Sequence, residues 1–156
     1  MAFVEVGQTL ELKYLLKHSC VIYSHELDEK IESMVSFASS KDKVKVDKVL
    51  TVTKGLNFET GKQKLVMDIY VEMNQPTKGN HQYLYIDSYK ITPCVYSKYK
   101  GHSQNASMAT REVNAYIKKH ELESIGPVHQ VMLIDKKSKK KNKKNKVTLE
   151  VYVQVS

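Results

Sequence analysis

The sequence predicts an α+β fold built from two fused strand-helix-strand-strand modules. Two ten-residue segments alternate in the same way between apolar and polar residues, and each is preceded by the same order of strand, helix and strand. Module one covers about 3–74, module two covers about 82–156, and residues 74–81 form a turn-rich linker. We expect antiparallel sheets side by side, with both helices on one face and a central cleft on the other.

The two alternating segments are residues 64–73 and 146–155, and they match position for position. A period of two is typical of a strand with one buried and one solvated face. Asp68 matches Glu150, and Tyr70 matches Tyr152. One face of each segment is purely aliphatic, comprising Leu65, Met67, Ile69, Val71 and Met73 in the first and Val147, Leu149, Val151, Val153 and Val155 in the second.

A helical period follows a short β-rich run in each module, at 19–24 and at 93–97, which we match to each other. Ser24 is the expected N-cap of the first helix, and Ser103 or Asn105 that of the second. Further strands are expected at 46–53 and 128–134. The apolar stripes of the two helices are Leu27, Ile31, Met34, Val35 and Ala38, and Ala109, Val113, Tyr116, Ile117 and His120.

The composition is that of a globular protein. Apolar residues make up 41% of the 156 positions and charged residues 27%, which excludes a collagen-like or wholly disordered chain. Neither a membrane-spanning apolar run nor a secretory signal is visible, so we expect a cytoplasmic protein. Cys20 and Cys94 lie far apart without metal-ligand spacing, and we expect neither a metal nor a cofactor.

The net charge of +8 arises from one segment, residues 136–146. Eight of the 25 Lys and Arg residues lie there, and the remaining 17 balance the 17 Asp and Glu residues. The positive charge of this segment suggests that it could bind the phosphate backbone of a nucleic acid. Its lysines are interspersed with Ser and Asn rather than with aromatic residues, so nothing in the segment supports base stacking. A solvated loop is the alternative reading.

The strand pattern also predicts a candidate site. If the aliphatic faces pack under the helices, then the acid–tyrosine pairs Asp68–Tyr70 and Glu150–Tyr152 share the opposite face. A carboxylate beside phenol rings suits a cationic or polar aromatic ligand, because the rings supply apolar area and cation–π attraction. The alternative is an ordinary polar face of an antiparallel sheet.

Three segments of the second module, 88–101, 125–134 and 149–155, resemble the GyrI-like small-molecule-binding domain, the effector-binding half of multidrug-responsive transcription regulators. Gly101 stands where the family closes a strand before its helix, and Gly126-Pro127 resembles its turn into the next strand. The resemblance implies the two-module fold and a ligand contact at Glu150 in the cleft. Its further site candidates are Tyr152, Tyr70, Asp68, Tyr96 and Tyr99, although core packing also explains the last two.

The chain departs from the family pattern in three respects. Gln154 stands where a proline is often seen, and the chain has no Trp, so tyrosines must line any cleft. The lysine-rich segment has no counterpart in the family. Strand-like sequence begins at Val4, so we expect a stand-alone member without a DNA-reading domain.

Binding of a small ligand without turnover is the function that the sequence favours. A cleft hydrolase with Glu150 as general base is one alternative, although no GxSxG, HExxH or P-loop motif is present. A protein-binding, inhibitor or immunity-type role is another. The ligand's identity and the oligomeric state stay open.

Overall fold

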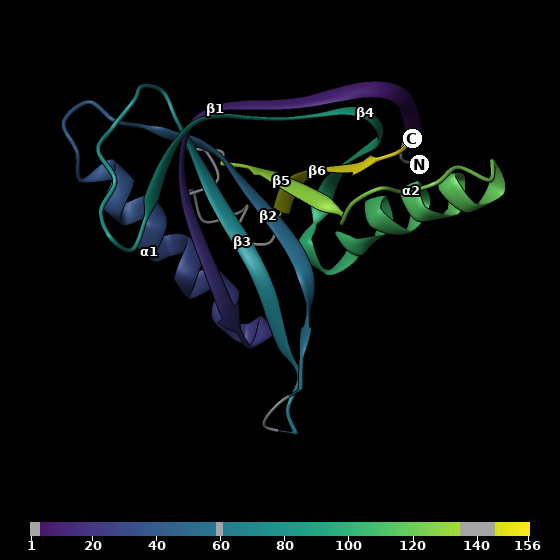
Figure 1. Ribbon diagram of the computed structural model, residues 1–156, viewed down its shortest axis with the longest axis horizontal. Coiled ribbons are helices and arrows are strands. Elements are labelled where there is room, and N and C mark those ends of the chain that lie inside the picture. The colour runs from purple at the N-terminus through teal and green to yellow at the C-terminus, as the bar shows by residue number, and fades with distance from the viewer. Residues whose placement is uncertain (1–3, 59–60, 135–145) are drawn as a thin grey trace. The chain divides into compact units, whose positions relative to one another are not determined.

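The computed structural model describes residues 4–58, 61–134 and 146–156, leaving the side chain of Lys146 aside. The fold is α+β, as expected, with antiparallel strand pairing (Figure 1). The strands are β1 (Val4–Ile22), β2 (Val46–Asn57), β3 (Lys64–Met73), β4 (Leu84–His102), β5 (His129–Leu133) and β6 (Lys146–Gln154), and the helices are α1 (Leu27–Ser39) and α2 (Ser107–Lys119).

The chain divides into two compact units whose bounds cross the order of the sequence. The first, here called the Asp68 unit, is Leu12–Tyr89. The second, the Glu150 unit, combines the chain up to Glu11 with Lys90–Ser156. The long strands β1 and β4 are therefore each shared between the units. That the whole chain works as one domain stays a prediction, and each unit is described by itself below.

In the Asp68 unit, β3 is the central strand and pairs antiparallel with β1 and β2. Ser19 and Val52 lie opposite Asp68. Helix α1 packs on β2 and β3 and buries Ile31, Met34 and Ala38. The strand's aliphatic positions from Met67 to Met73 are buried, as the alternation predicts, because they form one face of the strand.

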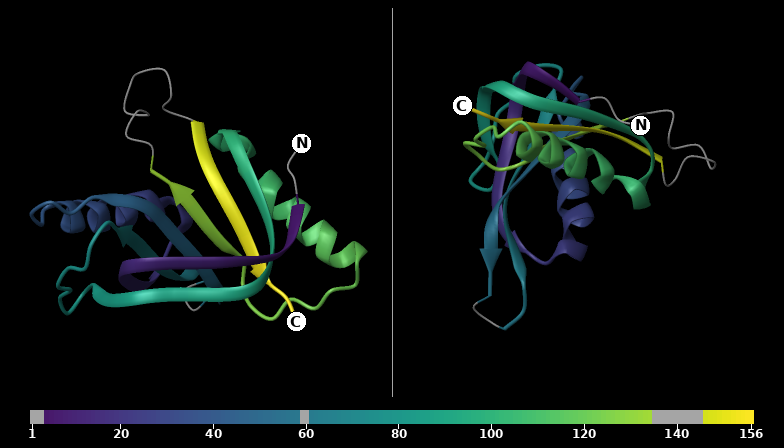
Figure 2. Two further views of the ribbon diagram at one scale, coloured as in Figure 1. Left: turned by 90° about the horizontal axis from the view of Figure 1, so that it is seen from above. Right: turned by 90° about the vertical axis from the view of Figure 1, so that its right-hand side faces the viewer.

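In the Glu150 unit, β6 is the central strand and pairs antiparallel with β4 and β5. Helix α2 packs on β6 (Figure 2). Leucine and valine side chains of β6 form a core with helix residues Ala109 and Val113 and with Val95 of β4. The aliphatic face of β6 therefore lies under the helix, as predicted, and Glu150 belongs to the other face.

Three details of the sequence prediction are wrong. Strands β1 and β4 extend over 19 residues each, well beyond the short runs expected. Neither helix has the expected cap, because 3-10 turns at Ser24–Glu26 and Ser103–Asn105 precede α1 and α2. Ser19 pairs with Asp68, and Lys98 pairs with Glu150. Ser19 is therefore equivalent to Lys98, so the predicted match of residues 19–24 to 93–97 is out of register.

The lysine-rich segment lies outside the described residues, except for Lys146 at the start of β6. Within the described ranges, no helix is long and apolar enough to cross a membrane. The same residues contain no group of three or more His, Cys, Asp or Glu side chains that could hold a metal ion. Both cysteines are free thiols.

Candidate functional site

Glu150 forms a compact cluster with two tyrosines on the face of β4 and β6 away from α2. Tyr96 Oη donates a hydrogen bond of 2.8 Å to Glu150 Oε2. The rings of Tyr96 and Tyr152 lie 4.8 Å apart at an interplanar angle of 77°. Tyr96 pairs with Tyr152 in the ladder, and Glu150 lies two pairs along on the same face, so Tyr96 reaches Glu150 diagonally across the strands. Antiparallel register thus assembles the cluster, here called the Glu150 cluster.

The charge of Glu150 is not paired with a cation among the residues that the structure describes. Its cross-strand neighbour Lys98 is exposed and forms no ion pair with it in that part of the chain. Oε2 accepts the Tyr96 hydrogen bond, and Oε1 has no protein hydrogen-bond partner there. A half-buried carboxylate in this state has the capacity to attract a cation from outside the protein.

Both tyrosines of the cluster stay neutral well above physiological pH. Burial, and then the charge of Glu150, raise the pKa of Tyr152 to about 12. Burial and the hydrogen bond to Glu150 raise the pKa of Tyr96 further above its usual value. The charge of Glu5 adds a smaller increase to the pKa of each phenol. The cluster therefore keeps neutral rings beside an acid.

Glu5 is a residue that the sequence prediction missed. It belongs to the Glu150 unit because the start of β1 belongs there, and it lies near enough to act on both tyrosines. The residues around Glu5 in the sequence do not predict this position, because it follows from the fold, in which the start of β1 belongs to the Glu150 unit and its remainder to the Asp68 unit.

His129 is the second missed residue. It pairs with Tyr152 from β5, is 3% exposed, and its Nδ1 lies 2.9 Å from the carbonyl oxygen of Pro127. Burial lowers the pKa of the imidazole below its usual 6.5. Val131, which pairs with Glu150, is also buried. The β5 residues beside the cluster are therefore uncharged.

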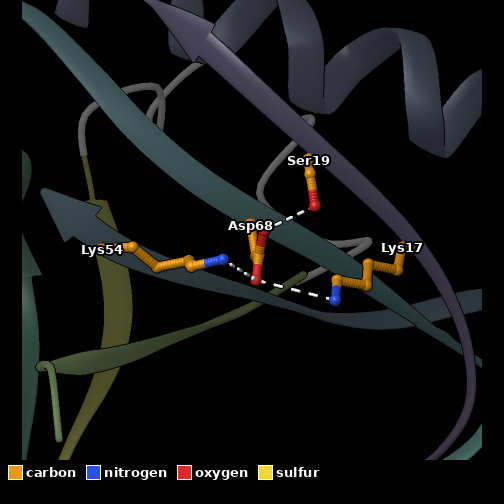
Figure 3. Close-up of polar contacts among 4 residues, drawn as sticks. All are labelled: Lys17, Ser19, Lys54 and Asp68. Atoms are coloured by element: carbon orange, nitrogen blue, oxygen red, sulfur yellow. Dashed lines mark hydrogen bonds and ion pairs between the residues drawn. The ribbon is translucent and has the colours of Figure 1, made fainter. Parts of the chain in front are cut away.

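Asp68 is placed very differently, although it is the counterpart of Glu150 in the Asp68 unit. Ser19 Oγ donates a hydrogen bond of 2.6 Å to Asp68 Oδ1. The ammonium groups of Lys17 and Lys54 lie 3.7 and 3.6 Å from Oδ2 (Figure 3). The Asp68 side chain is only 9% exposed. This carboxylate is already neutralised by the protein.

Tyr70 is also occupied by neighbours from its own unit. Its ring centroid lies 5.1 Å from that of Tyr89 and 5.6 Å from Lys17 Nζ. Burial and then the charge of Asp68 raise the pKa of Tyr70 to about 12. A lysine of the protein, Lys17, therefore already makes the cation–π contact with the Tyr70 ring.

Tyr99 lies on the other face of its sheet. Its ring packs against the core that α2 covers, and its Oη donates a hydrogen bond of 2.7 Å to the carbonyl oxygen of His102. Of the six predicted site residues, the structure brings Glu150, Tyr152 and Tyr96 together. Asp68 and Tyr70 lie together in the Asp68 unit, and Tyr99 joins neither group.

No protein-family model and no curated protein matches the chain. Among solved structures it is similar to the EcmrR C-terminal domain, with a TM-score of 0.66, 10% identity, and coverage of 100% of this chain and 97% of that one. The chain has the GyrI-like fold.

Two further structures share this GyrI-like fold with the chain. The chain matches EcmrR in its DNA complex with a TM-score of 0.74 and 9% identity; the match covers 99% of this chain and 57% of EcmrR. A protein of Listeria innocua described as a hydrolase matches with a TM-score of 0.54 and 11% identity, over 99% of this chain and 91% of that one.

Proposed function

We propose that the protein binds a small, cationic, aromatic ligand at the Glu150 cluster. The observation that carries this proposal is the Tyr96–Glu150 hydrogen bond of 2.8 Å beside the ring of Tyr152. This hydrogen bond holds the Glu150 carboxylate beside two neutral phenol rings. No cation among the described residues neutralises that carboxylate. The GyrI-like fold supports the proposal, because the resemblance associates this fold with effector binding.

The chemistry of the cluster suits a delocalised organic cation better than an anion or a neutral polar molecule. The carboxylate supplies the opposite charge, and each phenol ring supplies apolar area and a negative π face. A desolvated cation–π contact contributes about 2 kcal/mol, comparable to a charge-assisted hydrogen bond. Asp68 and Tyr70 are left out of the proposed site because Lys17 and Lys54 already occupy them.

The test uses a matched pair of probes, 5-methylphenanthridinium and neutral phenanthridine, titrated calorimetrically at pH 7.5. We expect the cation to bind more tightly than its neutral analogue. Glu150→Gln keeps the shape of the side chain and removes its charge, so we expect affinity for the cation to fall by about 5- to 20-fold, or about 1–2 kcal/mol.

The control is Glu123→Gln, which removes a charge from an exposed residue of the same unit and leaves the cluster intact. Its affinity for the cation is expected to equal that of the wild type. Equal affinity for the two probes, or an unchanged affinity in Glu150→Gln, would refute the proposal.

One observation favours a second candidate function, ester or ring hydrolysis. Oε1 of Glu150 has no protein hydrogen-bond partner among the described residues, while Tyr96 fixes Oε2. A carboxylate oriented in this way is able to accept a proton from an attacking water. Turnover of a panel of aryl esters and lactones that is lost in Glu150→Gln but kept in Glu123→Gln would support this reaction. An intact panel would exclude it for those substrates.

A further inference from the structure

The Asp68 unit contains a pocket of about 370 Å³. One side is formed by β1 and the other by the segment that leads into β4. The volume lies within the range of small-molecule sites. The pocket is lined by Lys17, His18, Ser19, His81, Gln82 and Leu84, none of which is acidic.

The β4 side of the pocket is held in place by a backbone turn at Asn80. The Asn80 side-chain Oδ1 accepts hydrogen bonds of 2.8 and 2.7 Å from the backbone nitrogens of Gln82 and Tyr83. The backbone nitrogen of Asn80 donates a hydrogen bond of 2.9 Å to the Tyr83 carbonyl. A Cβ at Gly79 would overlap that same carbonyl oxygen, so the turn packs too closely for a side chain there. The wall is therefore preorganised before any ligand arrives.

His18 connects the two sides of the pocket. Its Nδ1 lies 3.2 Å from the carbonyl oxygen of Gln82, and its ring meets the buried Tyr83 edge-on at 5.5 Å. A carbonyl only accepts, so Nδ1 is the donor in this bond. The imidazole is thus fixed in orientation between β1 and the segment before β4.

The charge around the pocket is positive. Lys17 and Lys54 share the single carboxylate of Asp68, which leaves one positive charge in surplus within this group (Figure 3). The distance of 3.7 Å from Lys17 Nζ to Asp68 Oδ2 is longer than a hydrogen bond, so the ammonium has donors to spare for another acceptor. Lys17 lines the pocket itself, whereas Asp68 does not.

We infer that this pocket binds a small phosphate monoester. The residues that line it include a lysine, two histidines and a glutamine, and phosphate oxygens accept several charge-assisted hydrogen bonds at once from side chains of these types. The pocket is larger than a phosphate group alone, and the exposed Leu84 adds an apolar side chain to its lining, which leaves room for the organic part of an ester. The site lies in the other unit from the Glu150 cluster and prefers the opposite charge, so it does not depend on the proposed function.

The test is calorimetric titration of the full chain with ribose 5-phosphate in low salt at pH 7, with ribose and inorganic phosphate as comparison probes. We expect saturable binding of ribose 5-phosphate, weaker binding of inorganic phosphate, and none of ribose. His81→Ala alters an exposed lining residue, and we expect it to weaken ribose 5-phosphate binding at least fivefold. Lys17→Gln provides a second variant that removes the ammonium, with the same expected loss.

The matched control is His25→Ala, which removes an exposed histidine of the same unit outside the pocket and is expected to leave the affinity unchanged. Absence of saturable binding would overturn the inference, as would full affinity in both folded variants. Equal affinity for ribose and its phosphate would overturn the anionic assignment. Inorganic phosphate binding as tightly as the ester would overturn the assignment to a monoester.

Discussion

Asp68 and Glu150 occupy equivalent positions on the central strands of the two units, each two residues before a tyrosine. In the Asp68 unit, the residue that pairs with this tyrosine is Lys17, and its ammonium turns to the carboxylate. In the Glu150 unit the corresponding residue is Tyr96, which donates a hydrogen bond but carries no charge.

This difference shows how a duplicated pattern can serve two purposes. A lysine at the cross-strand position neutralises the acid and fills the cation site on the neighbouring ring, so the acid contributes to the stability of its own unit. A tyrosine at the same position orients the acid and leaves its charge available. The residues around the acid, and not the acid itself, separate a structural carboxylate from a candidate binding carboxylate, and Lys17 against Tyr96 is the difference at the cross-strand position.

The largest expected effect comes from removing the charge of Asp68. Asp68→Asn leaves Lys17 and Lys54 without their partner, and we expect a loss of about 2 kcal/mol in the free energy of unfolding. This lies below the cost of breaking a fully buried pair because Lys54 is 53% exposed. Glu150→Gln, which separates no ion pair, is expected to lose less than about 1 kcal/mol. Urea denaturation measures both, and equal losses would remove the contrast between the units.

The next effect is on ligand binding. Tyr96→Lys gives the Glu150 unit the residue that the Asp68 unit has at this position, so the new ammonium competes for Glu150. We expect about a tenfold loss of affinity for 5-methylphenanthridinium, corresponding to about 1.4 kcal/mol. Asn114→Lys adds the same charge to an exposed position of α2 and serves as the control. Equal losses in the two variants would mean that net charge, and not position 96, governs binding.

The smallest effect concerns acid stability and His129, whose equivalent in the Asp68 unit is Leu50. Burial lowers the pKa of His129 from 6.5, so below pH 6.5 the unfolded chain takes up a proton at this residue that the folded chain does not. Its contribution to stability is therefore lost as the pH falls through the lowered pKa. We expect His129→Leu to lose less stability than the wild type between pH 7.5 and pH 5 in urea titrations. An identical pH dependence would count against a buried neutral imidazole.

The central strands and their faces could be predicted because both alternate strictly, with one face under a helix. The equivalence of Asp68 with Glu150 and of Tyr70 with Tyr152 follows from that alternation alone. The extent of β1 could not be predicted in this way. Gly7 and Tyr14 have positive φ angles within the strand and interrupt its period of two.

The residues that contact the two acids could not be predicted from the local sequence pattern either. Lys54 reaches Asp68 from a stretch of β2 where the register shifts between Thr53 and Gly55, and no periodicity places a residue at such a bulge. Glu5 joins the Glu150 unit from the far end of the sequence. Both contacts depend on tertiary pairing, whereas Tyr96 could be proposed because it lies in the strand that enters α2.

The most direct test of the account compares two charge-removing variants in one binding measurement. The dissociation constant of 5-methylphenanthridinium is determined for Glu150→Gln and Asp68→Asn, at a temperature where circular dichroism shows both to be folded. The account predicts weaker binding in Glu150→Gln and wild-type affinity in Asp68→Asn. A loss in Asp68→Asn with none in Glu150→Gln would contradict it.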